Sequence, residues 1–428
     1  MSGDTGTLPP RSGVRGLLGR IVVDTRPLKI PAFRRLWSST VVTAIGTQLT
    51  AVAVPKQVFD LTGSSGYVGL TGAVALVPLL VFGLWGGAVA DAVDRRKLLL
   101  VTNFGVAVTS ALLWLQAFAG FGSVWLVLVL LAVNQAFFAI NMPTRGAVIA
   151  RLVPPELLPS ANALSATMST FGAVFGPLLA GALIPVIGLS TLYLIDVVAL
   201  TVTLLAVWRL PALPPLDGQT RRAGLSDVID GFRYLATQKV LLASFVVDII
   251  AMVAGMPRAL IPEMAERTFG DPPGGGPALG WLYAAIPAGA MLIGLFSGWL
   301  TRVRRQGVAV VVSICAWGAA VAAFGIAQSL WLGVLFMALA GAADMVSAIY
   351  RMAILQVATT DEMRGRLQGV FTVVVAGGPR IADVTHGWAA AGFGTAVAAS
   401  GGGLLVIVLV LASMLLLPAF WRYRAPTA

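Results

Sequence analysis

The chain has 428 residues, of which 58% are hydrophobic and 11% are charged, and its mean hydropathy is +0.89. Soluble proteins carry roughly a quarter charged residues, so this composition excludes an ordinary soluble protein and indicates an integral membrane protein. The net charge of +11 fits basic loops beside anionic lipid better than it fits nucleic-acid binding.

Twelve apolar stretches follow one another along the chain, and each can cross a bilayer as a helix of about 20 residues. We therefore expect an all-α membrane protein with two groups of six helices. The first six spans cover 36–58, 65–90, 97–119, 123–147, 161–186 and 189–209. The second six cover 240–264, 279–301, 308–328, 330–354, 366–392 and 396–419.

A long polar stretch after the sixth span marks the domain boundary. Apolar residues recur at helical spacing behind it, which predicts an amphipathic helix along the inner membrane surface. The predicted parts are an N-terminal segment over 1–35, a six-helix bundle over 36–210, a linker with the amphipathic helix over 211–239, a second bundle over 240–420 and a tail over 421–428.

The basic residues lie on one predicted side of the membrane. All but four of the 29 Lys and Arg residues fall in the connections or ends of that side, the exceptions being Lys56, Arg258, Arg267 and Arg380. The positive-inside rule then places both termini in the cytoplasm. The polar segment 1–30 lacks the pattern of a cleavable secretory signal.

The two halves of the sequence repeat each other. Arg145 and Glu156 stand eleven residues apart at the end of the fourth span, and Arg351 and Glu362 stand eleven apart at the end of the tenth. Equivalent charges at equivalent span ends suggest a duplicated six-helix unit, an architecture in which two bundles rock about a central site.

Two motifs carry a resemblance to a known family. The stretch 87–97, Gly-Ala-Val-Ala-Asp-Ala-Val-Asp-Arg-Arg-Lys, resembles the loop between spans 2 and 3 of the major facilitator superfamily, G-x-L-A-D-R-x-G-R-R-K, with departures at Ala92 and Asp94. The stretch 172–181 is similar to the antiporter motif G-x-x-x-G-P-x-x-G-G of span 5. It matches at Gly172, Gly176, Pro177 and Gly181, and Ala180 is the change.

Three further segments, at 33–37, 152–164 and 364–369, resemble the twelve-span drug and siderophore exporter branch of that superfamily. The resemblance implies the major facilitator fold, with two pseudo-symmetric six-helix bundles. It also implies a monomeric secondary active transporter in the bacterial cytoplasmic membrane that moves its substrate outward.

Physically, the loop motif fits a latch that closes the cytoplasmic side. Asp91 can meet the positive N-terminal end of span 11, and the arginines can meet acids such as Glu156. The alternative is that these charges only set topology. The span-5 motif would build a tight, kinked helix interface, or serve packing alone. The candidate gate residues are Gly87, Asp91, Arg95, Arg96, Arg145, Glu156, Arg351 and Glu362.

Several ionisable residues lie inside predicted spans, where each costs about 2.5–3.5 kcal/mol at the bilayer centre. Asp248 and Asp344 fall near the middle and have no local basic partner on the same helix. Arg380, Asp383 and His386 step by three along one helical face. They follow Gly377-Gly378-Pro379, a triplet expected to loosen span 11. Asp196 and Arg258 sit toward the outer side of their spans.

We expect one or more of Asp248, Asp344 and Asp383 to change protonation during transport, because burial disfavours the charged form of a carboxyl group. The alternative for Arg380 and Asp383 is a permanent ion pair that locks span 11. His386 can be a hydrogen-bonded structural residue or a proton relay.

The sequence thus predicts a secondary active transporter that exports lipophilic or amphipathic small molecules in exchange for protons. One alternative is a siderophore or lipid exporter without strict proton coupling, and another is a transport-inactive sensor or scaffold. No phosphate-binding loop, zinc motif or nucleophile elbow is present, so no ATP use, cofactor, metal or enzymatic activity is expected. The expected partners are the substrate, protons and membrane lipids, and no nucleic acid.

Overall fold

Helices and their connections make up the computed structural model, which describes residues 24–215 and 225–424. Within these ranges side chains are described except at 84–88, 90–91, 225–228, 361–362, 364–366, 368–369 and 372. Every regular element in the described ranges is a helix. The predicted all-α class is therefore confirmed.

The first group of helices, which we call the N-half, contains η1 (Arg26–Lys29), α2 (Pro31–Thr62), α3 (Ser65–Ala92), α4 (Arg95–Phe118), α5 (Val124–Leu152), η2 (Pro155–Leu157) and α6 (Leu158–Trp208). In this group, a polar side chain caps the start of α3, α4 and α5. Ser64, Asp94 and Ser123 each accept hydrogen bonds from the first free backbone N–H groups of the helix that follows.

The N-terminal segment is attached to the N-half by Asp24. Its carboxylate accepts a hydrogen bond of 2.9 Å from Ser160. Hydrogen bonds from Arg26 hold the pKa of this carboxyl well below its usual range. Asp24 is therefore charged at neutral pH, where it ties the start of the described chain to α6.

The predicted spans 161–186 and 189–209 form the two legs of α6, which meet at Gly188. This residue has φ 77° and ψ 160° inside the helix, a conformation that glycine adopts with little strain. Gly172 of the first leg lies against Ala44, and Thr203 of the second leg lies against Thr43. The legs therefore run antiparallel along α2.

The second group, which we call the C-half, contains α8 (Lys239–Gly255), η3 (Arg258–Leu260), α9 (Ile261–Arg267), α10 (Pro277–Leu295), η4 (Ser297–Arg302), α11 (Gln306–Gly325), α12 (Leu330–Ala358), α13 (Asp361–Phe393), α14 (Thr395–Leu416) and α15 (Pro418–Trp421). The C-half differs from the predicted spans in two places. Helix α8 ends at Gly255 and Pro257 precedes η3, so the predicted span 240–264 comprises α8, η3 and the start of α9. The predicted span 279–301 leaves the α-helix at Phe296.

The prediction that Gly377-Gly378-Pro379 loosens its helix is wrong, since α13 runs without interruption through Pro379. Neighbouring helices hold it there. A Cβ atom at Gly378 would lie 2.7 Å from Cβ of Met252 in α8, so α8 packs directly on the glycine. Close packing in a membrane helix interface compensates for the weaker local helix propensity.

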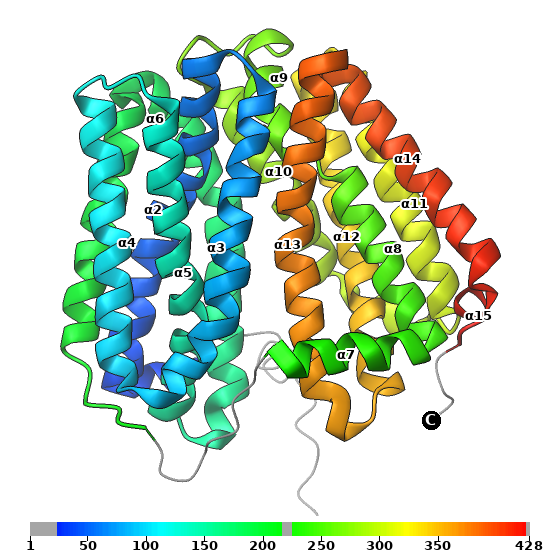
Figure 1. The fold of residues 1–428 in the computed structure, drawn as a ribbon, viewed down its shortest axis with the longest axis horizontal. Coiled ribbons are helices and arrows are strands. Elements are labelled where there is room, and N and C mark those ends of the chain that lie inside the picture. Colours follow the sequence, from blue (N-terminus) through cyan, green and yellow to red (C-terminus); the bar gives the residue numbers. More distant parts are fainter. Residues whose placement is uncertain (1–23, 216–224, 425–428) are drawn as a thin grey trace, which may run out of the picture.

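The two halves stand side by side, with α3 against α13 and α6 against α10. Figure 1 places the start of α2, α7 (Leu225–Thr237) and α15 at one end, which we call the terminal end, and α9 at the other, which we call the distal end. Helix α7 is the predicted amphipathic helix, and it crosses the terminal end of the C-half.

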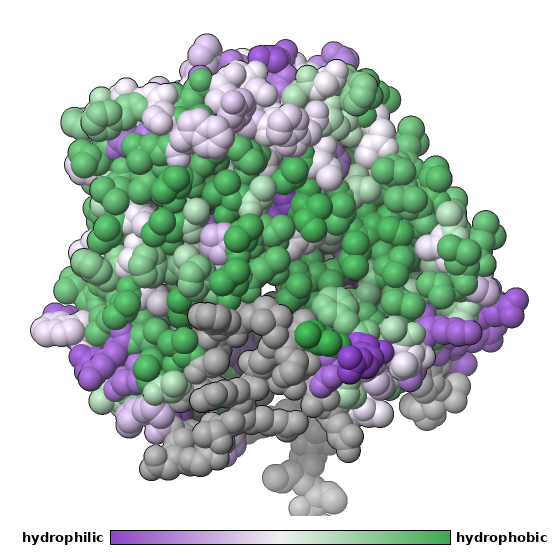
Figure 2. Space-filling model, viewed as in Figure 1, coloured by the Kyte–Doolittle hydropathy of each residue, from purple (hydrophilic) through white to green (hydrophobic). Residues whose placement is uncertain are grey.

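The face seen in Figure 2 is apolar over most of its height, as a membrane protein requires. Within the described ranges, nine helical stretches are long and apolar enough to cross a membrane. One of the nine covers both legs of α6, and the long helices α2 and α13 are not among them. The number of twelve spans therefore stays a prediction.

Candidate substrate cavity and the contacts that close one end

A cavity of about 740 Å³, including its open mouth, lies between the two halves. The N-half contributes hydrogen-bonding side chains to its wall, and the C-half contributes charges and a phenol. The polar lining residues are Thr47, Thr50, Thr71, Asn134, Gln135, Arg258, Tyr283, Arg380 and Asp383. Small-molecule sites are concave and combine an apolar wall with a few polar groups, as this cavity does.

Two arginines and one aspartate form the charged part of the cavity. Arg380 and Asp383 are one turn apart on α13, with 4.0 Å between Nη1 and Oδ2. Arg258 enters from η3, and its guanidinium lies 5.9 Å from the ring centre of Tyr283. Two guanidinium groups facing one carboxylate leave a positive balance, which favours acceptor oxygens or negative charge on a bound molecule.

The end of α8 brings Arg258 to this position. Because the helix stops at Gly255 and Pro257 precedes η3, the chain turns inward there and places Arg258 beside α10. A second pocket beside the first shares Arg258 and Tyr283 and extends toward Pro177 of the span-5 motif.

Asp196 lies behind the cavity wall, in the second leg of α6. Its side chain accepts hydrogen bonds from Thr50 at 2.8 Å and from Ser110 at 3.0 Å. The residue is 2% exposed, and Thr50 itself lines the cavity. The Thr50 hydroxyl thus separates this buried carboxyl from the cavity.

Asp248 and Asp344, which have no local basic partner in the sequence, share one arginine. Arg351 of α12 forms an ion pair with Asp248 of α8, and its Nη2 lies 3.7 Å from Oδ1 of Asp344. Asp248 is buried, whereas 31% of the Asp344 side chain is exposed. The predicted gate residue Arg351 therefore lies in a charged triad inside the C-half.

His386 lies away from the central cavity. Its Nδ1 is 3.1 Å from the carbonyl oxygen of Ala382 on the same helix. The ring lines an apolar groove between α8, α13 and α14 together with Thr385, Gly402 and Leu405. Asp383, one turn earlier, faces the cavity instead.

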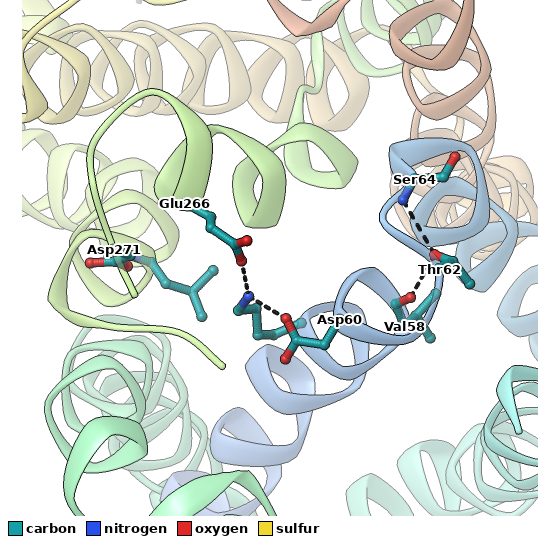
Figure 3. Close-up of polar contacts among 8 residues, drawn as sticks. Val58, Asp60, Thr62, Ser64, Glu266 and Asp271 are labelled. Carbon is teal, nitrogen blue, oxygen red and sulfur yellow. Dashed lines mark hydrogen bonds and ion pairs between the residues drawn. The ribbon is translucent and has the colours of Figure 1, made fainter. Parts of the chain in front are cut away.

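An ion pair between Lys56 and Glu266 joins the two halves at the distal end (Figure 3). Lys56 of α2 is 1% exposed and pairs with Asp60 on its own helix and with Glu266 of α9, at 2.6 Å. Nearby, Ser65 donates to Glu263 at 2.5 Å. In the sequence, Lys56 stands out only as a basic residue outside the predicted cytoplasmic loops. The available signal was Asp60, an acidic residue four positions later, just beyond the first predicted span.

Arg267 of α9 completes this distal contact. It donates to the carbonyl oxygen of Gly63, in the α2–α3 connection, at 3.0 Å and to Glu263 at 2.5 Å. The contact therefore links α9 of the C-half with two successive helices of the N-half. We call Lys56, Asp60, Glu263, Glu266 and Arg267, which carry this contact, the distal latch.

Glycines permit a second close contact between the halves. A Cβ atom at Gly181 in α6 would lie 2.7 Å from Cα of Gly280 in α10. Gly172 faces Ala44 and Gly176 faces Gln48, both within the N-half. The span-5 motif thus serves two interfaces, because its first two glycines pack α6 on α2 and its last packs the two halves together.

The loop after α3 is held to the N-half. Asp94, which departs from the family motif, caps α4 and accepts from the backbone N–H groups of Arg96 and Lys97. The backbone of Arg95 donates to Leu213 at 3.1 Å, and the Arg96 guanidinium donates to the carbonyl oxygen of Trp208. The Asp94 side chain thereby caps the start of α4, which the glycine usual at this motif position cannot do.

The other predicted gate residues lie apart from this loop or outside the described side chains. Arg145 donates to Thr40 of α2, and Glu156 is exposed in η2. The side chains at Gly87, Asp91 and Glu362 lie outside the described residues, so the proposed latch of Asp91 with span 11 stays a prediction.

The fold resembles solved membrane transporters at low sequence identity. The nucleoside transporter NupG aligns with a TM-score of 0.70, covering 91% of this chain and 98% of that chain at 14% identity. The POT family transporter PepTSo aligns with a TM-score of 0.71 and the same coverages at 13% identity. The chain therefore has the fold of these multi-pass membrane transporters, and its match to a family model of the major facilitator superfamily makes it a transporter of that superfamily.

Comparison with related sequences assigns the chain to a particular family of transporters. The family described as transmembrane secretion effector matches residues 24–423, and the chain belongs to that family. It is similar to the enterobactin exporter EntS of Citrobacter koseri, with 30% identity over 401 residues, which are 92% of this chain and 94% of that protein. It is also similar to EntS of Shigella boydii, with 32% identity over 353 residues and coverages of 80% and 81%.

Proposed function

We propose that this transporter exports an oxygen-rich small molecule of the siderophore class across the bacterial cytoplasmic membrane by alternating access. The charge of the cavity carries this proposal. Arg258 and Arg380 suit carbonyl, phenolate or carboxylate oxygens of a substrate. Asn134, Gln135 and three threonines of the N-half add donors and acceptors. Relatives named enterobactin exporters support the same substrate class.

The terminal end is the cytoplasmic side in this proposal, because the basic loops gather there. The contacts described between the halves, the distal latch and the Gly181–Gly280 contact, lie toward the distal end. At the other ends of α3 and α10, a Cβ atom at Gly83 or Gly294 would meet no described atom within 4 Å. A conformation that is closed at the distal end and open at the terminal end accepts substrate from the cytoplasm. Release of the substrate on the other side requires the distal contacts to separate.

Export is driven by proton entry in our proposal. A hydroxyl of the substrate donates a stronger, charge-assisted hydrogen bond to Asp383 while that carboxyl is ionised, so protonation of Asp383 from outside weakens binding and favours release of substrate. The triad of Arg351 with Asp248 and Asp344 supports a second exchange site, because one guanidinium does not neutralise two carboxylates. Asp344 is the more exposed of the two.

Flux of enterobactin in proteoliposomes, with and without an imposed proton gradient, tests the proposal. We expect gradient-stimulated flux that Arg380→Gln and Asp383→Asn lower about tenfold or more, which corresponds to about 1.4 kcal/mol. Arg233→Gln, a change of an exposed residue of α7, is the matched control and leaves flux intact. Addition of substrate also releases protons, and Asp383→Asn or Asp344→Asn reduces that release.

The alternatives give different results in the same assay. Flux without gradient dependence or proton release refutes coupling and supports the uncoupled exporter. Flux of ethidium but not of enterobactin refutes the siderophore class and supports lipophilic drug export. Binding without flux of either compound refutes transport and supports a sensor.

A further inference from the structure

The C-terminal segment folds back onto the start of α11. The backbone N–H of Gly307 donates to the carbonyl oxygen of Tyr423 at 3.4 Å, and Phe420 is fully buried. Any side chain at position 307 would collide with the backbone of Phe420. The residues after α15 therefore occupy a defined place beside the first turn of α11.

This fold-back gathers three arginines around one pocket. Arg305, from the residue before α11, meets Arg422 and Arg424, from the residues after α15. The pocket measures about 580 Å³ including its open side, and Val308 and Trp421 complete its lining. Within the described ranges no carboxylate forms an ion pair with these three arginines, so their charges repel one another unless an anion is bound.

Exposed apolar residues precede the C-terminal part of the pocket along the chain. Leu415 and Leu416, at the end of α14, are 84% and 81% exposed. Figure 2 shows hydrophilic residues gathered below the apolar surface where Figure 1 places α15. Trp421 is 43% exposed, and tryptophan favours the level of the lipid headgroups. The pocket therefore lies at the boundary between hydrocarbon and water.

We propose that this pocket binds the phosphate of an anionic phospholipid in the leaflet at the terminal end. Arginine is suited to phosphate because its planar guanidinium donates two parallel hydrogen bonds to phosphate oxygens. The exposed leucines of α14 offer a surface to the acyl chains. A free phosphate ion satisfies the arginines equally but gains nothing from these leucines.

Native mass spectrometry of the full-length protein in detergent tests this site. Dioleoyl phosphatidylglycerol, dioleoyl phosphatidylcholine and inorganic phosphate are the three probes. We expect saturable binding of phosphatidylglycerol, with affinity about tenfold or more above that for the other two probes. The triple change Arg305→Gln, Arg422→Gln and Arg424→Gln lowers the affinity for phosphatidylglycerol to the level of phosphatidylcholine.

The matched control removes the same amount of charge from the same end of the molecule. Arg34→Gln, Lys97→Gln and Lys239→Gln change three exposed residues that are not part of the pocket lining, and they leave the affinity unchanged. Arg424→Gln alone, at an exposed position, lowers the affinity without affecting folding. Equal losses in the triple change and the control overturn a localised site. Equal binding of inorganic phosphate and phosphatidylglycerol overturns a lipid site.

Discussion

Arg351 of α12 and Asp248 of α8 form an ion pair in the C-half, and Arg145 of α5 contacts Thr40 of α2 at the corresponding place in the N-half. Each arginine lies 21 residues after the first residue of a 29-residue helix. Thr40 and Asp248 each lie nine residues after the first residue of their helices. The arginine therefore occupies the same position in both halves. Its partner is a carboxylate in the C-half and a threonine hydroxyl in the N-half.

Removal of the arginine from this pair should destabilise the C-half. Arg351→Met leaves Asp248 buried without its counter-charge, a change that costs about 3–5 kcal/mol in proteins. We expect a lower midpoint in thermal unfolding of the detergent-purified protein. Arg351→Met combined with Asp248→Asn should recover much of the loss, because no lone charge then stays buried. Equal midpoints for the single and double variants would contradict a direct pair.

Loss of the buried lysine should open the distal end. Lys56→Met leaves Asp60 and Glu266 facing each other without a cation, so repulsion replaces attraction. In a Cys315→Ser background, a reporter cysteine introduced by Thr71→Cys should react severalfold faster with an impermeant maleimide added from outside. Lys239→Met, which changes an exposed lysine at the other end, is the control. An unchanged rate in the Lys56 variant would show that the latch does not hold the halves together.

A side chain at the contact between α6 and α10 should also disfavour this conformation. A Cβ atom at Gly280 would lie 2.6 Å from the carbonyl oxygen of Pro177, so Gly280→Leu forces the helices apart. We expect slower transport and faster labelling of the same reporter cysteine. Gly294→Leu, on the same helix but with no described atom within 4 Å of the new Cβ, should leave the labelling rate of the reporter cysteine unchanged. If the two variants behave alike, helix propensity rather than the interface explains the effect.

The cavity arginine on η3 should contribute to substrate affinity. Arg258→Gln removes one charge from the wall and should raise KM for enterobactin flux about tenfold, as loss of a charge-assisted hydrogen bond predicts. The maximal rate should change less, since the helices that move retain their contacts. Arg258→Lys should restore part of the affinity. A lowered maximal rate with unchanged KM would assign Arg258 to the conformational change instead.

Local features of the chain could be predicted from the sequence with good accuracy. Apolar stretches of sufficient length become helices in a membrane because backbone groups there must pair within the segment. The common face of Arg380 and Asp383 follows from helical geometry alone. The ends of α8 at Gly255 and of α10 at Leu295 do not follow from hydropathy, because apolar residues continue beyond both helix ends.

The tertiary structure decides which charged residues form ion pairs with one another. Arg351 was expected at a cytoplasmic gate, yet packing of α12 on α8 brings it to Asp248 and Asp344. Lys56 reaches Glu266 only because α9 folds over the N-half. The sequence determined that charges lie within apolar helices, because composition is a property of each segment. Their partners depend on the rotation and height of one helix against another, and only the packed structure fixes these.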